Sequence, residues 1–432
     1  MALPYEIVGG EMRRPAGFEG VREEHLFDGQ TDYYTREVSP ELSEVRSFAV
    51  PDGVTAIGAE LFAHCENLSA VTIPYGVTSI GRGAFSGCRA LASVTVPESV
   101  TFIGEDAFAG CRALTSIALP DALTSMGERA FAGCRALADI TVPAGTVSVG
   151  KKAFAGCKGL ADADGMVIVR GVLYDYFGPG GKVVIPKGVT AIGEGAFIDC
   201  DSLTDITIPE SVTSVGTGAF EGCRNLTSVS IRGGGMSIGE FAFGRCSRLK
   251  SVTISGRVTS VGDRAFTHCS SLTAFSVPDG VRSIGKGVFW GCGNLKSVTV
   301  PSSVTAVDAL AFMNCGKLAS IHIADLTLID EGHRPACCVG FAEDRRGCAD
   351  ANGKKYLEYM RSHVEALLDL ALHRPALFHL LTRENVIGES LLNEKMDRIL
   401  RSGNAEIIAM ALEYKSRLAA EAKHDPLEEF TL

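Results

Sequence analysis

The stretch "FSGCRALASVTVPESVTFIGEDAFAGCRAL", residues 85–114, decides the fold because it nearly repeats itself. Its unit F-S-G-C-R at 85–89 returns as F-A-G-C-R at 108–112, 23 residues later. The Phe-x-x-Cys unit occurs eleven times, and successive cysteines are 23 residues apart except for one step of 43. A fixed period of about 20 to 50 residues indicates a stacked repeat architecture. The repeated cysteines are Cys65, Cys88, Cys111, Cys134, Cys157, Cys200, Cys223, Cys246, Cys269, Cys292 and Cys315.

Each unit reads approximately L-x-x-V-x-I-P-x-x-V-T-S-I-G-x-x-A-F-x-G-C. Leu68, Val71 and Ile73 have the spacing of one short strand whose apolar side is turned inward. A proline follows in most units and ends the strand, because it has no N–H to donate to a sheet. A second extended stretch then leads to a glycine in a fixed position. We expect this glycine to mark either a special backbone angle or a close approach that only glycine tolerates.

The repeated cysteine could be a metal ligand, a disulfide partner or a small buried side chain. Cysteine packs well in interiors as a small hydrophobe, and its position is next to the core phenylalanine. Disulfides between neighbouring coils are geometrically allowed at a Cα separation of about 5 Å. Stacked side chains point the same way, however, and eleven is an odd number to pair. Zinc sites use paired ligands such as C-x2-C, which the chain lacks. We predict buried thiols and no metal, with some disulfides as the alternative.

These motifs resemble the BspA-like (Treponema-type) leucine-rich repeat family, whose unit has the same Pro…Ile-Gly-x-x-Ala-Phe-x-x-Cys pattern. The resemblance covers residues 46–324. It implies a curved, β-rich leucine-rich-repeat solenoid, here of about eleven 23-residue coils. It also implies adhesion or protein binding, often at bacterial or protist surfaces, and no catalysis. Two units have Arg232 and Ser255 in place of the proline, so we expect the stack to loosen there.

The two ends of the chain lack the repeat. Residues 1–45 are predicted to form an N-terminal cap, because the open end of a solenoid exposes strand edges. Residues 325–432 place apolar side chains at helical spacing and predict a small all-α C-terminal domain. Two helices joined near Gly403 resemble an ankyrin-type helix pair. The aromatic residues available to the cap are Phe27, Tyr33 and Tyr34.

The long step between cysteines contains an insertion at about residues 162–181. Apolar residues alternate on both sides of Arg170-Gly171, which predicts a tight hairpin. The hairpin carries Tyr174, Tyr176 and Phe177. Exposed aromatic side chains on a protruding element are good anchors for a partner, but these rings could equally pack on the neighbouring coil.

A basic column follows the cysteines, formed by Arg89, Arg112, Arg135 and Lys158 in four successive coils. Because like charges at coil spacing repel, we expect either nearby carboxylates or an acidic partner. Trp290 is the only tryptophan and follows a core phenylalanine. With Met313 one coil later, it would form a small apolar patch or pack against the C-terminal domain.

Composition excludes several classes of function. A formal net charge of −10 argues against a nucleic-acid partner, which needs a dominant basic surface. No apolar run reaches the roughly 18 residues of a membrane span. The N-terminus lacks the basic start and apolar run of a signal peptide, so we expect a cytoplasmic protein, with the cell surface as the alternative.

The sequence contains no recognisable catalytic constellation. We find no phosphate-binding loop, nucleophile elbow or paired carboxylates in a suitable context. We therefore predict no catalytic, cofactor or metal site, and a non-enzymatic scaffold that binds protein through the solenoid surface and the helical domain. The alternative is a cell-surface adhesin for host matrix or cells. One group of possible ligands at the domain junction matches no usual zinc pattern: His322, His333, Cys337, Cys338 and Cys348.

Overall fold

The computed structural model describes most of the chain. The described residues are 6–8, 11–13, 21–27, 32–38, 44–344 and 350–421, with side chains for 11–13, 44–344 and 350–420. The chain divides into two compact units: Met1–Cys223 with Ile238–Phe243, and Arg224–Ser237 with Gly244–Leu432. None of the described helices has the length and apolar composition needed to cross a bilayer.

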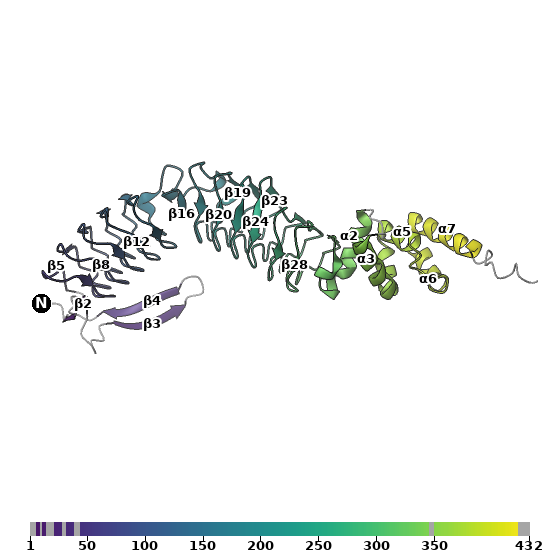
Figure 1. The fold of residues 1–432 in the computed structure, drawn as a ribbon, viewed down its shortest axis with the longest axis horizontal. Coiled ribbons are helices and arrows are strands. Elements are labelled where there is room, and N and C mark those ends of the chain that lie inside the picture. The colour runs from purple at the N-terminus through teal and green to yellow at the C-terminus, as the bar shows by residue number, and fades with distance from the viewer. Residues whose placement is uncertain are drawn as a thin grey trace, which may run out of the picture. The chain divides into compact units, whose positions relative to one another are not determined.

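The first five coils, residues 47–149, each contribute two short strands to two parallel sheets (Figure 1). Val71 lies beside Val94 in the register, one 23-residue period apart. Both valines point inward and are 6% exposed, while the residues on either side of each are exposed. The first sheet contains β5 (Ser47–Ala49), β7 (Ala70–Thr72), β9 (Ser93–Thr95), β11 (Ser116–Ala118) and β13 (Asp139–Thr141). The second contains β6 (Ala56–Ile57), β8 (Ser79–Ile80), β10 (Phe102–Ile103), β12 (Ser125–Met126) and β14 (Ser148–Val149).

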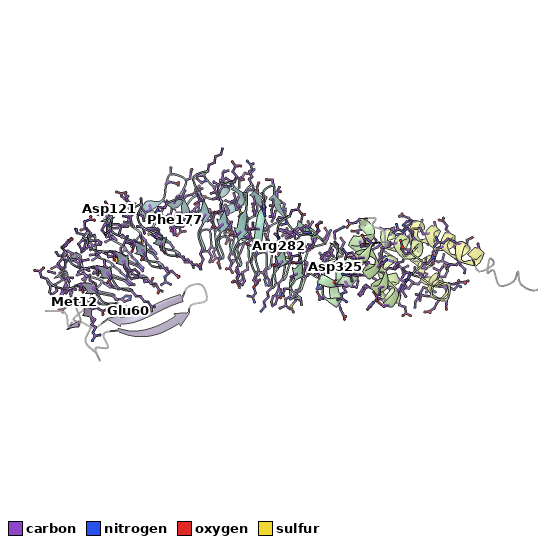
Figure 2. All side chains as sticks on the ribbon, in the orientation of Figure 1. Met12, Glu60, Asp121, Phe177, Arg282 and Asp325 are labelled. Atoms are coloured by element: carbon purple, nitrogen blue, oxygen red, sulfur yellow. The ribbon has the colours of Figure 1, made fainter. Side chains whose placement is uncertain are left out.

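The edge of the second sheet is covered by the N-terminal segment. Strand β2 (Glu11–Arg13) pairs in parallel with β6 and places Met12 beside Ile57, where Met12 is fully buried (Figure 2). Strand β1 (Glu6–Val8) pairs antiparallel with β2. Strands β3 (Val21–Phe27) and β4 (Asp32–Val38) form an antiparallel hairpin. The side chains of Phe27, Tyr33 and Tyr34 lie outside the described side chains.

A column of phenylalanine rings fills the core beside the sheets. The rings of Phe62, Phe85, Phe108 and Phe131 stack with centroids 5.1 to 5.2 Å apart and nearly parallel planes. All four side chains are fully buried. The ring spacing is close to the roughly 4.8 Å between hydrogen-bonded strands, so one coil height suits both the rings and the sheet ladder.

The glycine column is explained by close approach between coils. A Cβ on Gly127 would lie 2.3 Å from the backbone nitrogen of Glu105 in the preceding coil, a distance that no real side chain tolerates. The left-handed backbone lies two residues later, at positions such as Gly83, Asp106 and Arg129 (φ of 59°, 53° and 54°). The glycine column is therefore needed for space, and a different position carries the unusual backbone angle.

The insertion forms the predicted hairpin and joins the stack. Strands β15 (Met166–Val169) and β16 (Val172–Tyr176) pair antiparallel about Arg170 and Gly171, which have φ of 50° and 75°. Strand β16 then pairs in parallel with β18 (Ala191–Ile192), which pairs in parallel with β20 (Ser214–Val215), and β17 (Gly181–Val184) pairs with β19 (Leu203–Ile208). The insertion therefore adds about one coil to the eleven expected, so the solenoid has about twelve turns.

The second unit continues the repeat, but its sheets are interrupted. Strand β21 (Ser228–Ile231) pairs with β23 (Ser251–Ile254). A separate sheet contains β25 (Ala274–Ser276), β27 (Ser297–Thr299) and β29 (Ser320–His322), and another contains β26 (Ser283–Ile284) and β28 (Ala306–Val307). The remaining strands are β22 (Met236–Ile238) and β24 (Val258–Val261). Among the described residues, β23 does not pair with β25, nor β24 with β26.

A helical domain follows the last coil of the second unit. Helix α2 (Arg334–Glu343) packs on β29 so closely that a Cβ on Gly340 would lie 2.3 Å from the carbonyl oxygen of Ile321. Tyr356 is fully buried and donates a hydrogen bond to the Ile323 carbonyl at 3.1 Å. The first α-helix after the last coil begins at Arg334, within the predicted helical domain of residues 325–432. The helices are α2 (Arg334–Glu343), α3 (Ala351–Ser362), α4 (Val364–Ala371), α5 (Pro375–Arg383), α6 (Glu389–Arg401) and α7 (Ala405–Glu421), preceded by the 3-10 turns η2 (Leu326–Leu328) and η3 (Glu331–His333).

Candidate functional site

The repeated cysteines are structural. Ten of the eleven are buried and Cys200 is half-buried, and all the described cysteines are thiols without a disulfide. The Cys111 thiol donates a hydrogen bond at 3.2 Å to the carbonyl of Phe85 in the preceding coil. Equivalent bonds, 26 residues back along the chain, are made by Cys88, Cys134, Cys157, Cys223, Cys292 and Cys315.

Burial keeps these thiols protonated. Desolvation raises the pKa of Cys315 to about 11 and raises the pKa of Cys292 further. A thiol that keeps its proton is a donor and a poor nucleophile. The predicted buried thiols are therefore confirmed, and they add a hydrogen bond between successive coils that the sequence did not indicate.

The basic column lies on an exposed face of the first unit. Arg89, Arg112, Arg135 and Lys158 are all exposed. Their backbones stack, because the N–H two residues after each cysteine donates to the preceding member of the column: the Arg89, Arg112 and Arg135 carbonyls accept at 3.1, 3.2 and 3.0 Å. The structure therefore brings the four predicted side chains into one row.

Within the described part of the chain, one member of the row has an ion-pair partner. Arg89 forms an ion pair with Glu66 of the preceding coil at 3.2 Å. Among the described residues, Arg112, Arg135 and Lys158 have no hydrogen-bond or ion-pair partner for their side chains. Two unit charges about 5 Å apart in water repel by roughly 1 kcal/mol. The row therefore presents three cations whose mutual repulsion a bound anionic group would relieve.

The surface beside the basic column is flat. Small residues occupy the two positions before each cysteine, and the glycines among them have φ between 73° and 76°. No large side chain in these positions would keep an extended partner from lying along the column. These neighbours are Ala109, Gly110, Ala132, Gly133, Ala155 and Gly156.

Two of the three hairpin aromatics are part of the core. Tyr174 is 7% exposed and meets the Phe154 ring edge-on at 5.2 Å. Tyr176 is 9% exposed and packs on Phe197 at 4.8 Å. The packing alternative therefore holds for both tyrosines, since alternation along β16 turns them inward. Phe177, the last of the three, is 38% exposed (Figure 2).

Trp290 is half-buried in the second unit, and Met313 is 41% exposed. Their backbones are adjacent, because the Gly291 N–H donates to the Met313 carbonyl at 2.9 Å. The apolar patch and the packing of Trp290 against the C-terminal domain both stay predictions.

The histidines at the domain junction bind carboxylates. His322 lies 2.8 Å from Asp344 and 3.4 Å from Glu343, and His333 lies 2.7 Å from Asp330. Cys337 and Cys338 are fully buried in α2. Cys348 lies outside the described residues. No group of three His, Cys, Asp or Glu side chains that could hold a metal ion occurs among the residues the structure describes.

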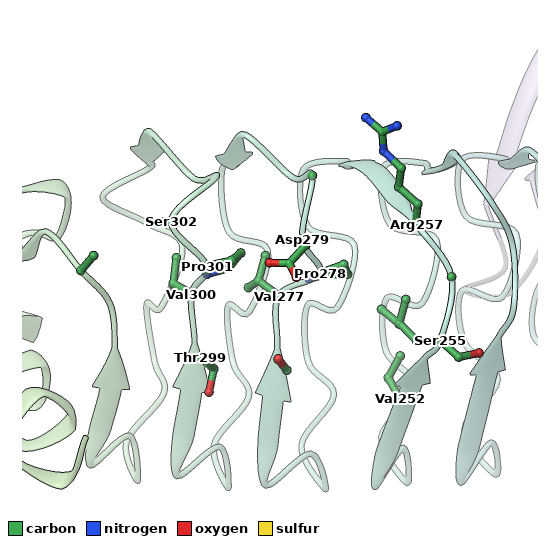
Figure 3. Close-up of a pocket in the computed structure, with 15 residues that line it drawn as sticks. Val252, Ser255, Arg257, Val277, Pro278, Asp279, Thr299, Val300, Pro301 and Ser302 are labelled. Atoms are coloured by element: carbon green, nitrogen blue, oxygen red, sulfur yellow. The ribbon is translucent and has the colours of Figure 1, made fainter. Parts of the chain in front are cut away.

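A groove opens in the second unit where β23 and β25 fail to pair. It has a volume of about 940 Å³ and is lined by three successive coils and the start of a fourth (Figure 3). Val252, Ser255 and Arg257 come from the first of these coils, and Val277 and Asp279 from the second. The missing prolines predicted loosening in this region, and Ser255 lines the groove. The groove itself could not be predicted, because it depends on how far two coils separate.

These observations define a leucine-rich-repeat solenoid with a helical domain at its C-terminal end. The repeats match the family model described as BspA type leucine rich repeat region, in six copies, over residues 41–161, 179–293 and 223–333. The chain belongs to this family. Proteins with leucine-rich repeats are generally protein-interaction scaffolds and generally non-enzymatic. A search of curated proteins finds no match.

Several solved structures are similar to this chain. A leucine-rich repeat protein from Bacteroides ovatus ATCC 8483 is 25% identical over 73% of this chain and 92% of that chain, with a TM-score of 0.43. A leucine rich cell surface protein from Faecalibacterium prausnitzii A2-165 is 27% identical with the same coverage and a TM-score of 0.41. The pneumococcal vaccine antigen PcpA is 19% identical over 66% of this chain and 69% of that chain, with a TM-score of 0.41.

Proposed function

We propose that the protein is a non-enzymatic scaffold that binds an acidic segment of another protein along the basic column of the first unit. The observation that carries this proposal is the row of Arg112, Arg135 and Lys158, which is exposed and has no carboxylate partner among the described side chains. The helical domain is available as a second contact surface of the same scaffold.

An acidic peptide fits this row for electrostatic and geometric reasons. The chain as a whole is acidic, with a net charge of −10, so an anionic partner is repelled by most of the surface. A local row of cations against such a background directs the partner to one place. The small residues beside the row leave room for an extended backbone. Each exposed pair is worth at most about 1 kcal/mol, so we expect weak binding that depends on several contacts together.

A charge reversal tests the proposal. The variant Arg112→Glu, Arg135→Glu, Lys158→Glu is compared with Lys182→Glu, Lys187→Glu, Lys250→Glu, which changes the net charge equally at exposed lysines outside the column. The probe is a fluorescein-labelled ten-residue glutamate peptide, measured by anisotropy across a salt series. We expect binding to the native chain and the control, with loss in the column variant. Equal weakening in both variants would show that the column is not the site.

The compartment of the protein stays a prediction. We propose a cytoplasmic location, with the cell surface as the alternative. Protease treatment of intact cells, followed by detection of the solenoid in each fraction, separates the two: cleavage by external protease would establish the surface location.

A further inference from the structure

The stack is open between two coils of the second unit. We call this place the open boundary: β23 and β24 belong to the coil on one side, and β25 and β26 to the coil on the other. In the next coils the Val277 N–H donates to the Thr299 carbonyl at 2.9 Å and the Lys296 N–H donates to the Thr273 carbonyl at 2.8 Å. The amides of Ile254 and Thr273, one period earlier, make no such bonds within the described structure.

The second sheet is interrupted at the same boundary. The Thr305 N–H donates to the Arg282 carbonyl at 2.8 Å, and the Asp308 N–H to the Ile284 carbonyl at 2.9 Å. One period earlier, the amides of Arg282 and Gly285 donate to no backbone carbonyl in the described part of the chain. Within the described residues, the backbone hydrogen bonds between the two coils are therefore missing in both sheets, between β23 and β25 and between β24 and β26.

The third side of the same coils remains joined. Across the boundary, the amides of Arg264, Phe266 and His268 donate to carbonyls of the following coil at 2.9, 3.0 and 2.6 Å. The coils therefore meet along the Phe-Cys turn and separate at their strands. The boundary has the form of a wedge that is closed at the turn, and the coils also touch at Gly280, where a Cβ would lie 3.2 Å from the Val258 carbonyl oxygen.

The sequence explains why the wedge opens here. Ser255 replaces the usual proline, and its N–H donates to the Ile231 carbonyl of the preceding coil at 2.9 Å, a bond that proline cannot make. Gly256 follows, and a Cβ there would lie 1.7 Å from the Gly233 carbonyl oxygen. Ser255 and Gly256 therefore pack against the preceding coil and not toward β25.

The opening exposes side chains that are core elsewhere. Val252, Ile254 and Val261 are only half-buried. Their equivalents one coil later, Phe275, Val277 and Ile284, are at most 5% exposed. The groove reaches Val252 and Ile254, and its volume of about 940 Å³ is within the range of ligand sites. Arg257 lines the groove (Figure 3), and its side chain lies against the next coil, because a Cβ on Gly280 would be 3.5 Å from the Arg257 Nε.

We propose that the open boundary is a docking site for an extended peptide of a partner protein, which adds as a strand to β23 and has apolar side chains at alternate positions. Backbone edges with unmatched N–H and C=O groups are completed by another strand, which satisfies them in register. A strand presents N–H and C=O groups in the register of β23, which a helix or a compact ligand does not. Some Cα atoms of β23 and β25 lie within 8 Å of each other, closer than two strands with a third between them, so the coils part further about the joined turn when the peptide enters. Alternate apolar side chains of the peptide would cover Val252 and Ile254, and its other side chains would point outward beside Thr253.

This inference is independent of the basic column, because the two sites share no residue. It adds a second kind of partner recognition, in which backbone pairing supplies affinity and the apolar positions supply specificity. The bound part of the partner peptide is expected to be short, because β23 is four residues long.

Hydrogen exchange tests whether the boundary is open in solution. In the full chain, the amides of Ile254, Thr273 and Arg282 are expected to exchange faster than their equivalents Val277, Lys296 and Thr305. Equal protection at both sets would mean that the ladder closes in solution, and the proposal would be overturned.

Peptide binding tests the occupant. The probe is the fluorescein-labelled peptide KSVTVP, the sequence of residues 296–301 of this chain. The control peptide carries N-methyl groups on the serine and the threonine, whose N–H groups face the preceding coil in the native register, and it keeps all the side chains. We expect the first peptide to bind and to slow exchange at Ile254 and Thr273, and the control to bind at least about tenfold more weakly. No binding up to about 1 mM, or equal binding of the control, would overturn the proposal.

Paired variants locate the site. Ile254→Asp places a carboxylate in the groove, and Thr253→Asp places one on the exposed face of the same strand. We expect Ile254→Asp to weaken peptide binding at least about tenfold and Thr253→Asp to leave it unchanged. Equal effects would show that the peptide does not enter the boundary. The exchange rates of the Phe266 and His268 amides confirm that each variant remains folded.

Discussion

The coils from β7 to β13 and the open boundary between β23 and β25 share one repeat but are held together differently. In the first region, both sheets are continuous and the Phe85, Phe108 and Phe131 rings stack 5.2 Å apart. At the boundary, both sheets are interrupted and the Phe266 and Phe289 rings are 6.0 Å apart. The Phe-Cys turn is joined in both regions. The Phe-Cys turn therefore keeps the coils connected, while the strands can separate.

The largest difference is expected from truncating the ring column. Phe108→Ala removes a fully buried ring between two close neighbours and should cost about 3–5 kcal/mol. Phe289→Ala should cost less, because Phe275 packs on it at 5.0 Å and can move into the space, next to coils that are already apart. Urea unfolding of the full chain gives the cost, and hydrogen exchange assigns it to the coils involved, since repeat stacks need not unfold in one step.

An equal loss in the free energy of unfolding for the two variants would contradict this difference between the regions. It would show that the core at the boundary is packed as rigidly as the core of the first unit.

The next effect is expected at the glycine column. Gly127→Ala directs a Cβ at backbone atoms of Gly104 and Glu105, which cannot move without displacing a coil. We expect a loss of about 2–3 kcal/mol in the free energy of unfolding. At Gly285 the nearest atom is the Asp263 carboxylate oxygen, which accepts from the Lys286 N–H at 2.9 Å and can rotate away at the cost of that one hydrogen bond. Gly285→Ala should therefore cost clearly less, as measured by urea unfolding. A larger loss at Gly285 would contradict the looser contact there.

Much of this architecture could be predicted from the sequence, because the period is strict. The eleven Phe-x-x-Cys units fixed the coil length, and alternation within each unit identified the inward valines. The two missing prolines indicated where the stack would loosen. Other features depend on atomic contacts between coils that are 23 residues apart. The thiol hydrogen bond to a phenylalanine carbonyl and the burial of Tyr174 and Tyr176 are of this kind.

The candidate sites divide in the same way. The basic column could be predicted, because a fixed period brings equivalent residues into a row. That Arg112, Arg135 and Lys158 have no ion-pair partner among the described side chains could not be predicted, since partners come from other positions of neighbouring coils. The groove at the open boundary results from the backbone bond of Ser255 to Ile231. Replacing proline with Ser255 makes this bond possible, because serine has an N–H to donate. The sequence shows the replacement but not the bond.

A smaller effect is expected from the cysteines. Cys134→Ala removes a fully buried thiol that donates to the Phe108 carbonyl at 3.1 Å, and should cost about 1–2 kcal/mol. Cys200 is half-buried, and its sulfur lies 3.4 Å from the Ser202 hydroxyl. Cys200→Ala should change the free energy of unfolding by no more than about 0.5 kcal/mol. Iodoacetamide labelling of the native chain should likewise modify Cys200 before Cys134, and the reverse order would contradict the buried thiol column.

The smallest effect is expected at the end of the first group of coils. Asp175 accepts a hydrogen bond from the Gly156 N–H at 2.6 Å, so a side-chain carboxylate satisfies the backbone amide at this end of the stack. At the open boundary, by contrast, no such group satisfies the amides of Ile254 and Thr273 within the described structure. Burial raises the pKa of Asp175 above its ordinary value of 3.8, although Gly156 and Tyr176 donate to it. The folded chain therefore keeps this proton to a higher pH than the unfolded chain does.

Stability from this group is consequently present below pH 3.8 and is lost as the pH rises through the raised pKa. Asp175→Asn removes the titration and keeps an oxygen that accepts from Gly156. The free energy of unfolding of the variant, minus that of the native chain, should rise by up to about 1 kcal/mol between pH 4 and pH 7. Urea midpoints at several pH values measure this difference, in which other carboxylates cancel. A difference that falls with pH would mean that the carboxylate is stabilised as an anion, and that the hairpin closes the ladder by charge as well as by hydrogen bonding.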